Sequence, residues 1–118
     1  MIAPKLVSLK KEGGDSQVRL LLMLGDERIG EARFRFWGKK SEVGILTNLT
    51  LSPEAVKDRS SHFDEWMIEQ VKKEIVQRHC SRLIVYKGNP TAEERKLYER
   101  LGFQKSIFGF CQSFSHLY

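Results

Sequence analysis

The sequence predicts a single α/β domain over residues 1–118, with a mixed, mostly antiparallel sheet and two main helices. Residues 60–79 have apolar side chains at helical spacing, which indicates a long amphipathic helix. A strand-like run at 44–51 precedes this helix, and a second one at 82–86 follows it. A strand, a helix and a strand in this order form a βαβ crossover, whose two strands are parallel. We expect the rest of the chain to assemble around this crossover.

The predicted helix begins at a capping box, because Ser61 and Asp64 have the Ser-x-x-acid spacing. Its apolar side chains are expected in the core, and they are Phe63, Trp66, Met67, Val71, Ile75 and Val76. Lys72 and Lys73 fall mostly off this face and are expected to be solvated. The loop before the helix is a natural place for an anion, since helix N-termini present unpaired N–H groups and a favourable dipole end.

Turn signals divide the remaining chain into short elements. Strands are predicted at 5–11, 17–24, 28–37, 43–51, 104–110 and 112–117, with the second and third forming a hairpin and the last two pivoting near Gly109. Residues 55–59 are predicted to be a loop or a short turn. A second helix at 91–101 begins with a Thr91–Glu94 capping box and stops at Gly102.

The composition narrows the class of protein. The chain is 41% hydrophobic and 30% charged, which is typical of a globular protein. The net charge of +5 favours anionic partners, but there is no run of five like charges, so a nucleic-acid partner is not expected. Cys80 and Cys111 are too few for a disulfide framework or a metal site. Neither a signal peptide nor a membrane span can be identified, so we expect a cytoplasmic protein without a membrane partner.

Three motifs, in this element order, resemble a known family. LYERLGF at 97–103 is similar to the LYEKLGF signature near the end of the Gcn5-related N-acetyltransferases, the GNAT superfamily. MLGDERIGEARF at 23–34 resembles their second and third strands, and NLTLSPE at 48–54 resembles the end of their fourth strand. The resemblance covers residues 17–110 and implies a small, divergent member with the GNAT-like (acyl-CoA N-acyltransferase) fold. Only a turn separates the first two strands, so the first two family helices are expected to be absent.

The resemblance implies acetyl-CoA as the acyl donor, bound where the fourth and fifth strands splay apart. The pantetheine arm is expected along the fourth strand at Leu49 and Leu51, and Asn89 is a further cofactor-binding candidate. The diphosphate is expected on the loop before the long helix, formed by Arg59, Ser60, Ser61, His62, Phe63 and Asp64. In the family this loop carries two small residues, usually glycines, which His62 and Asp64 replace here. A side chain at the first position crowds the diphosphate, and the Asp64 carboxylate repels it.

For catalysis the resemblance implies two residues. Tyr98 stands where many family members have a tyrosine that gives a proton to the leaving CoA thiolate. Asn48, on the fourth strand, can hold a water in place of the carboxylate that residues 44–51 lack. Because Tyr98 also falls on the apolar stripe of its helix, a purely structural role for its ring stays open.

Two functions are compatible with these residues. One is an acyl-CoA-dependent N-acetyltransferase that moves acetyl to an amine by direct transfer. Without the two early helices its acceptor site is open, which suits a protein or peptide amine or a site completed by the second copy in a homodimer. The other is a non-catalytic GNAT-like protein-binding module in which CoA binding is weak or lost. The sequence leaves open whether the chain is an enzyme.

Overall fold

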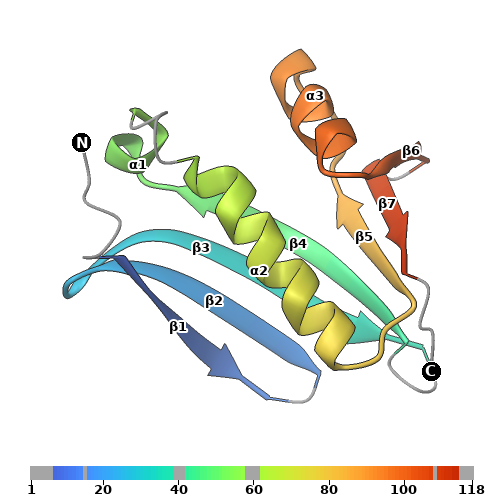
Figure 1. Cartoon of the computed structure of the whole chain (residues 1–118), viewed down its shortest axis with the longest axis horizontal. Coiled ribbons are helices and arrows are strands. Elements are labelled where there is room, and N and C mark those ends of the chain that lie inside the picture. The colour runs from blue at the N-terminus through green and yellow to red at the C-terminus, as the bar shows by residue number, and fades with distance from the viewer. Residues whose placement is uncertain (1–6, 15, 39–41, 58–61, 108, 115–118) are drawn as a thin grey trace.

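The computed structural model describes residues 7–14, 16–38, 42–57, 62–107 and 109–114 (Figure 1). In these residues one seven-stranded sheet carries α2 across one of its faces. The strands are β1 (Val7–Gly13), β2 (Gln17–Leu24), β3 (Glu27–Trp37), β4 (Val43–Leu51), β5 (Arg82–Tyr86), β6 (Gln104–Ser106) and β7 (Gly109–Ser113). The helices are α1 (Pro53–Lys57), α2 (Phe63–Gln77) and α3 (Ala92–Arg100). No helix within the described ranges is long and apolar enough to cross a membrane.

The strand order is β1-β2-β3-β4-β5-β7-β6, and β4 with β5 is the one parallel pair among the described strands. α2 connects these two strands, as the crossover pattern predicts. β1 and β2 form a hairpin in which Gly13 pairs with Val18, which leaves no room for a helix between them. The predicted fold, a mostly antiparallel mixed sheet without the two early helices, is confirmed.

α2 buries one face against the sheet, and this contact forms the core. The side chains that it buries are Phe63, Met67, Ile68, Val71 and Ile75. Burying an apolar side chain of this size contributes about 1.5–3 kcal/mol. Gly44 on β4 makes the closest approach, since a Cβ at this position would lie 2.1 Å from Ile75 Cδ1. A residue without a side chain is therefore needed for the helix to lie this close to β4.

The prediction that Trp66 and Val76 lie in the core is wrong. Trp66 is 37% exposed and Val76 is 41% exposed, whereas Ile68 is fully buried. The buried stripe is therefore rotated towards Ile68 from the predicted one. Lys72 also needs correction, because its side chain is only 12% exposed instead of solvated. Its ammonium group lies 4.9 Å from the Phe103 ring centroid, which fits a cation–π contact.

Several predicted boundaries also shift. Where a loop or a short turn was predicted at 55–59, the described residues form the five-residue helix α1, because Pro53 fits the first helical position and Ser52 Oγ accepts a hydrogen bond from the Ala55 N–H (3.2 Å). β1 runs two residues beyond its predicted end. The final hairpin turns between β6 and β7, ahead of Gly109, which already belongs to β7. The predicted stop of α3 is confirmed, since Gly102 has a φ of 95° just after the last turn.

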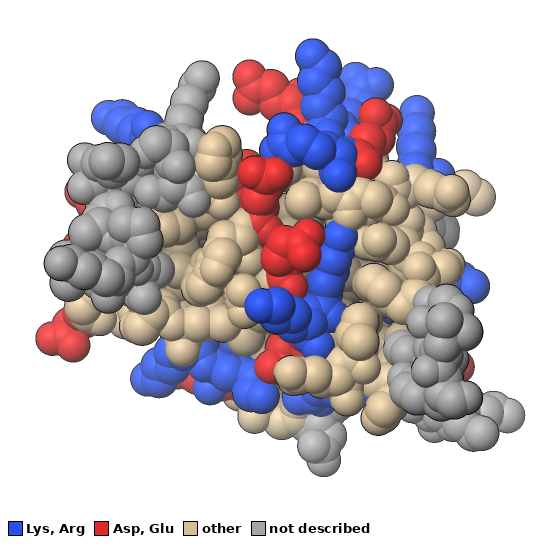
Figure 2. All heavy atoms as spheres, in the orientation of Figure 1, with Lys and Arg blue, Asp and Glu red and all other residues tan. Residues whose placement is uncertain are grey.

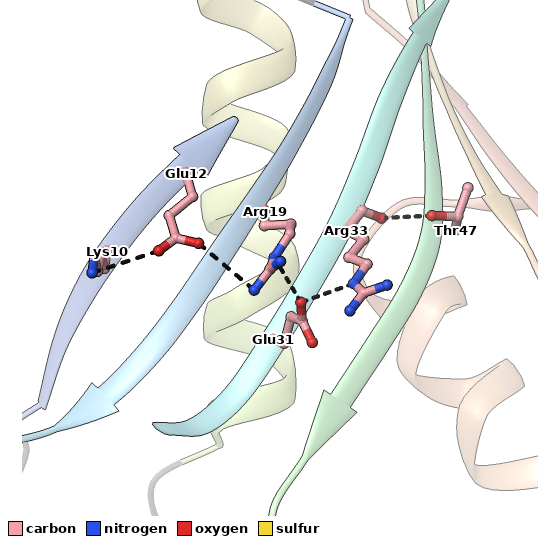
Figure 3. A network of polar contacts seen from close by, with 6 residues as sticks. All are labelled: Lys10, Glu12, Arg19, Glu31, Arg33 and Thr47. Carbon is pink, nitrogen blue, oxygen red and sulfur yellow. Dashed lines mark hydrogen bonds and ion pairs between the residues drawn. The ribbon is translucent and has the colours of Figure 1, made fainter. Parts of the chain in front are cut away.

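The sheet face away from α2 is polar along β1, β2 and β3 (Figure 3). Glu31 lies at its centre with a side chain that is 11% exposed. Arg33 Nε donates to Glu31 Oε1 at 2.8 Å, and Arg19 Nε forms an ion pair with the same oxygen at 3.0 Å, outside hydrogen-bond geometry. Glu12 extends the row by pairing with Arg19 and Lys10 at 3.6 and 3.5 Å. The hydrogen bond from Arg33 lowers the pKa of Glu31, and burial opposes this shift without cancelling it.

We expect Met67→Ala to lower the free energy of unfolding by about 2–5 kcal/mol, as truncation of a fully buried side chain does. Trp66→Ala should cost less than Met67→Ala, because the indole is already partly in water. Chemical denaturation of the two variants measures both values. A larger loss for Trp66→Ala would show that the helix is rotated the other way.

We expect Glu31→Gln to lower the free energy of unfolding at pH 7 by about 1–3 kcal/mol, since Glu31 accepts a charge-assisted hydrogen bond. The folded pKa lies below the ordinary value of 4.5, so the ionised form stabilises the fold above that value. This contribution is lost as the pH falls through the lowered pKa. Denaturant titrations between pH 7 and pH 3 should therefore show the two proteins converging, and a constant difference would contradict the assignment.

Candidate functional site

β4 and β5 separate part of the way along their length. Their parallel pairing begins at Val43 and Arg82 and ends at Leu46 and Val85, although β4 continues to Leu51. Thr47 is the extra residue of a β-bulge, because Phe34 pairs with Leu46 whereas Arg33 pairs with Asn48. The bulge falls at the first residue beyond the paired segment, so it accompanies the change in direction of β4. The predicted splay of the two strands is confirmed.

A groove of about 270 Å³ occupies the gap between the separated strands. The gap opens towards α3, as the arrangement of β4, β5 and α3 in Figure 1 shows. The residues that line the groove are Leu46, Thr47, Asn48, Leu49, Leu51, Val56, Asp64, Val85, Tyr86, Lys87, Glu94, Leu97 and Tyr98. They come from β4, β5, α1, α2, α3 and the loop after β5. The crossover and the chain that follows it therefore bring four parts of the sequence to one place, namely 46–56, 64, 85–87 and 94–98.

Tyr98 reaches this groove from α3 and is 4% exposed. Its ring stacks on Phe110 with centroids 4.7 Å apart and meets the edge of Phe103 at 5.5 Å. Burial, and after it the charges of Glu94 and Asp64, raises the pKa of Tyr98 to about 12. The phenol is therefore protonated at neutral pH and can donate a hydrogen bond to a group in the groove. Its packing and its place in the groove are compatible, so the two roles predicted for Tyr98 do not exclude each other.

Glu94 and Lys87 form an ion pair in the groove, at 2.7 Å between Lys87 Nζ and Glu94 Oε2. Glu94 is also the third residue of α3 and closes its capping box, because its side chain accepts from the Thr91 N–H and its own N–H donates to Thr91 Oγ1. Burial disfavours the charge on Glu94, but the hydrogen bonds from Lys87 and Thr91 outweigh it and lower the pKa. The groove thus holds an ionised carboxylate.

The structure places the N-cap of α2 one residue after Ser61, the predicted start of the capping box, which lies outside the described residues. Its N-cap is His62, which makes no side-chain capping hydrogen bond and has a left-handed backbone with φ 48° and ψ 49°. Asp64 Oδ1 accepts from the next N–H, that of Glu65, at 2.8 Å. His62 replaces a family glycine in the predicted loop, and it adopts a conformation that glycine takes readily. Arg59, Ser60 and Ser61 lie outside the described residues.

α3 is tied to α2 beside the groove. Arg100 contacts Glu65 Oε1 through Nε at 3.0 Å and through a terminal nitrogen at 2.9 Å. Lys72 Nζ donates to the carbonyl oxygen of Leu101, at the C-terminal end of α3. A cation at this end offsets the helix dipole and the unpaired carbonyl groups. Figure 2 shows the resulting band of interleaved acidic and basic side chains on this side of the molecule.

The structure brings together five of the predicted site residues, which are Asn48, Leu49, Leu51, Asp64 and Tyr98. Three others lie elsewhere. Phe63 is 6% exposed within the core, and His62 and Asn89 are exposed and do not line the groove. Sequence reasoning missed Lys87 and Glu94 as groove residues. The capping box already gave Glu94 a structural explanation, and Lys87 belonged to no motif.

We expect His62→Gly to be more stable than His62→Ala by about 1 kcal/mol, because alanine retains the cost of the left-handed conformation and glycine does not. Both changes remove the imidazole and its contact with Glu65 (3.4 Å), so the pair isolates the backbone effect. Thermal unfolding of both variants under identical conditions measures it. Equal stabilities would show that residue 62 is not left-handed.

Comparison with known proteins supports the fold and goes no further. No family model matches the chain, and no curated protein matches it. Among solved structures, a GNAT family acetyltransferase from Elizabethkingia anophelis with acetyl-CoA bound superposes with a TM-score of 0.71 at 14% identity, over 86% of this chain and 78% of that one.

Two further structures give the same result. The PaiA N-acetyltransferase from Thermoplasma acidophilum, in complex with coenzyme A, has a TM-score of 0.68 at 13% identity, over 84% of this chain and 62% of that one. A GNAT family acetyltransferase from Streptococcus pneumoniae has a TM-score of 0.67 at 14% identity, over 86% and 70%. In each case the superposition covers a larger share of this chain than of the neighbour, because the neighbours are longer. The chain has the fold of the GNAT acetyltransferases, as its motifs predict.

Proposed function

We propose that this protein is an N-acetyltransferase that uses acetyl-CoA as acyl donor and an amine as acceptor. The observation that carries the proposal is the gap between β4 and β5, which holds a groove lined by Tyr98 and Asn48. Beyond Leu46, β4 has no strand partner on its β5 side in the described residues. Its backbone groups there can pair with the amide groups of a pantetheine arm, as they would with a neighbouring strand.

In the proposed reaction the amine nitrogen forms a bond to the thioester carbonyl carbon and the carbon–sulfur bond breaks. A water held by Asn48 accepts the proton that the amine loses. Tyr98 donates a hydrogen bond to the leaving sulfur. A phenol of pKa about 12 is a much weaker acid than an ordinary thiol of pKa about 8.5, so full proton transfer would be uphill by roughly 5 kcal/mol. Tyr98 therefore stabilises the thiolate by donation, and the proton comes from solvent.

The groove suits one part of acetyl-CoA, the pantetheine arm, better than another, the diphosphate. The separated strand backbone suits the pantetheine arm, but Asp64 and Glu94 place two carboxylates in the same groove with only Lys87 to offset them. A diphosphate at the start of α2 would meet Asp64 at close range. Two like charges about 4 Å apart near a protein surface repel by ~4 kcal/mol. This observation favours a second candidate function, a non-catalytic module that keeps the fold and binds a protein while CoA binding is weak.

Calorimetric titration of acetyl-CoA into the wild type and into His62→Gly/Asp64→Gly tests the proposal. We expect binding to the double variant to be tighter by about 1–3 kcal/mol, because the variant removes both the side chain and the like charge from the loop. Asp64→Asn is the matched control, which removes the charge alone and should give part of the gain. Tight wild-type binding that neither change affects would show that the diphosphate lies elsewhere.

The rate of acetyl transfer to an amine provides a second test, for which the informative variant is Tyr98→Phe. Tyr98→Phe keeps the packed ring and removes the hydroxyl, so it should leave acetyl-CoA affinity unchanged and lower the rate of acetyl transfer to amine acceptors, measured as CoA release, by about 100-fold, as the loss of one hydrogen-bond donor to a developing negative charge does. Unchanged turnover would remove Tyr98 from the mechanism. No binding of acetyl-CoA by the wild type or by the double variant would favour the non-catalytic module.

A further inference from the structure

A second surface lies on the sheet face away from α2, across β3, β4 and β5. Gly44 faces Ile75 of α2, so the next residue, Ile45, points to the opposite face. Leu83 and Val85 lie in the core, so Arg82, Ile84 and Tyr86 share the face of Ile45. Pairing confirms the arrangement, since Ile45 is opposite Arg35 on one side and Ile84 on the other.

Two large aromatic side chains flank this surface. Trp37 is 68% exposed and Tyr86 is 59% exposed. Trp37 lies in one row with Val43 and Arg82, and Tyr86 lies four residues along β5 from Arg82. With strands about 4.8 Å apart and about 3.3 Å per residue, the two aromatic residues are roughly 16 Å apart across the face. That spacing lets them hold separate parts of one extended ligand.

Arginines surround the half-buried floor of Ile45 and Ile84. Arg35 and Arg82 are exposed and form no ion pair with any other described residue. Arg33, next along β3, shares the single carboxylate of Glu31 with Arg19. A guanidinium group can donate two parallel hydrogen bonds to the oxygens of one phosphate, and it can also stack on an aromatic ring. The surface therefore offers cations and aromatic rings side by side.

The net charge of the described residues differs between the helices and the strands. The helices carry two more acidic than basic residues, whereas the strands carry five more basic than acidic ones. The groove between β4, β5 and α3 holds two carboxylates against one lysine. On the outer face three arginines, Arg33, Arg35 and Arg82, stand against Glu31, whereas the groove is net acidic, so an extended polyanion is favoured at the outer face over the groove.

We propose that this face, formed by Arg33, Arg35, Trp37, Arg82 and Tyr86, binds single-stranded nucleic acid. Phosphates pair with the arginines, and unpaired bases stack on Trp37 and Tyr86. An acidic peptide would use the arginines equally well, but it has no planar bases for the two exposed rings. The combination of exposed rings and guanidinium groups on a sheet face that no described helix covers therefore selects nucleic acid over an acidic peptide. Tyr86 also lines the groove, so the two sites adjoin at this residue, but Trp37 and the arginines do not line the groove and the assignment does not depend on acetyl-CoA binding.

The test uses the full chain and a fluorescein-labelled oligothymidylate of twelve nucleotides. In a Trp66→Phe background Trp37 is the one remaining tryptophan, so its emission reports on this face alone. We expect saturable binding by anisotropy at 50 mM salt, with quenching of Trp37. Arg35→Ala/Arg82→Ala should weaken binding about ten-fold or more and reduce the slope of log K against log salt by about 1.4, which is 0.7 per lost phosphate contact. Trp37→Ala should weaken it roughly 5- to 150-fold.

The matched control is Lys73→Ala/Arg95→Ala, which removes two exposed cations from α2 and α3 and gives the same change in net charge. It should bind the oligonucleotide within about two-fold of the wild type. An equal loss of affinity in this control would overturn the proposal, because it would show that binding depends on the net charge of the protein and not on this face. Absence of binding at 50 mM salt, unchanged Trp37 emission at saturation, or equal affinity for a twelve-residue polyglutamate would each overturn it as well. Matching thermal unfolding curves establish that all variants are folded.

Discussion

The fold depends on the point at which β4 and β5 stop pairing. Four residue pairs join them, and beyond Leu46 the backbone of β4 loses its neighbour on this side. Unpaired backbone groups inside a protein are costly, so the gap must remain open to solvent or to a ligand. The bulge at Thr47 fixes this point, because an extra residue bends the strand and strengthens its twist. The hydroxyl of Thr47 adds a hydrogen bond to the Arg33 carbonyl at 3.2 Å, which ties the bulge to β3.

The gap keeps its width because α3 is held on two sides, by an aromatic cluster and by α2. Tyr98 stacks on Phe110 of β7 and meets Phe103, so the aromatic cluster packs α3 against the far part of the sheet. Arg100 and Lys72 tie the same helix to α2. These contacts contribute unequally to stability. Exposed ion pairs contribute about 0–1 kcal/mol, whereas stacked rings add ~0.5–1.5 kcal/mol beyond the contribution of their burial. The rings therefore hold α3 in place, and the charges set its orientation.

The sequence predicts the parts of this design that arise from local patterns. Apolar periodicity identifies the crossover, and the Thr91–Glu94 spacing identifies the start of α3 with its capping hydrogen bonds. Periodicity could not place Trp66, because a helix of this pattern allows two adjacent rotations and only the sheet distinguishes them. Nor could it place Glu94 and Lys87 in the groove, since they reach it through the return of the chain after β5. Asn89, two residues from Lys87 in the same loop, stays outside it.

The uncovered sheet face shows how the fold can dispense with the two early helices. Leu21 is only 5% exposed, although it points away from α2 and no described helix covers this face. Its partners in register are Lys10 and Glu31, and Arg19 lies two residues away on its own strand. Long charged side chains lay their apolar stems over such a position while their heads pair in water, as the row from Lys10 to Arg33 does. That row ends before β4, and towards β4 and β5 the same face carries the exposed rings of Trp37 and Tyr86. One half of this face is thus closed by paired charged side chains, whereas the other half keeps exposed aromatic rings that a ligand can contact.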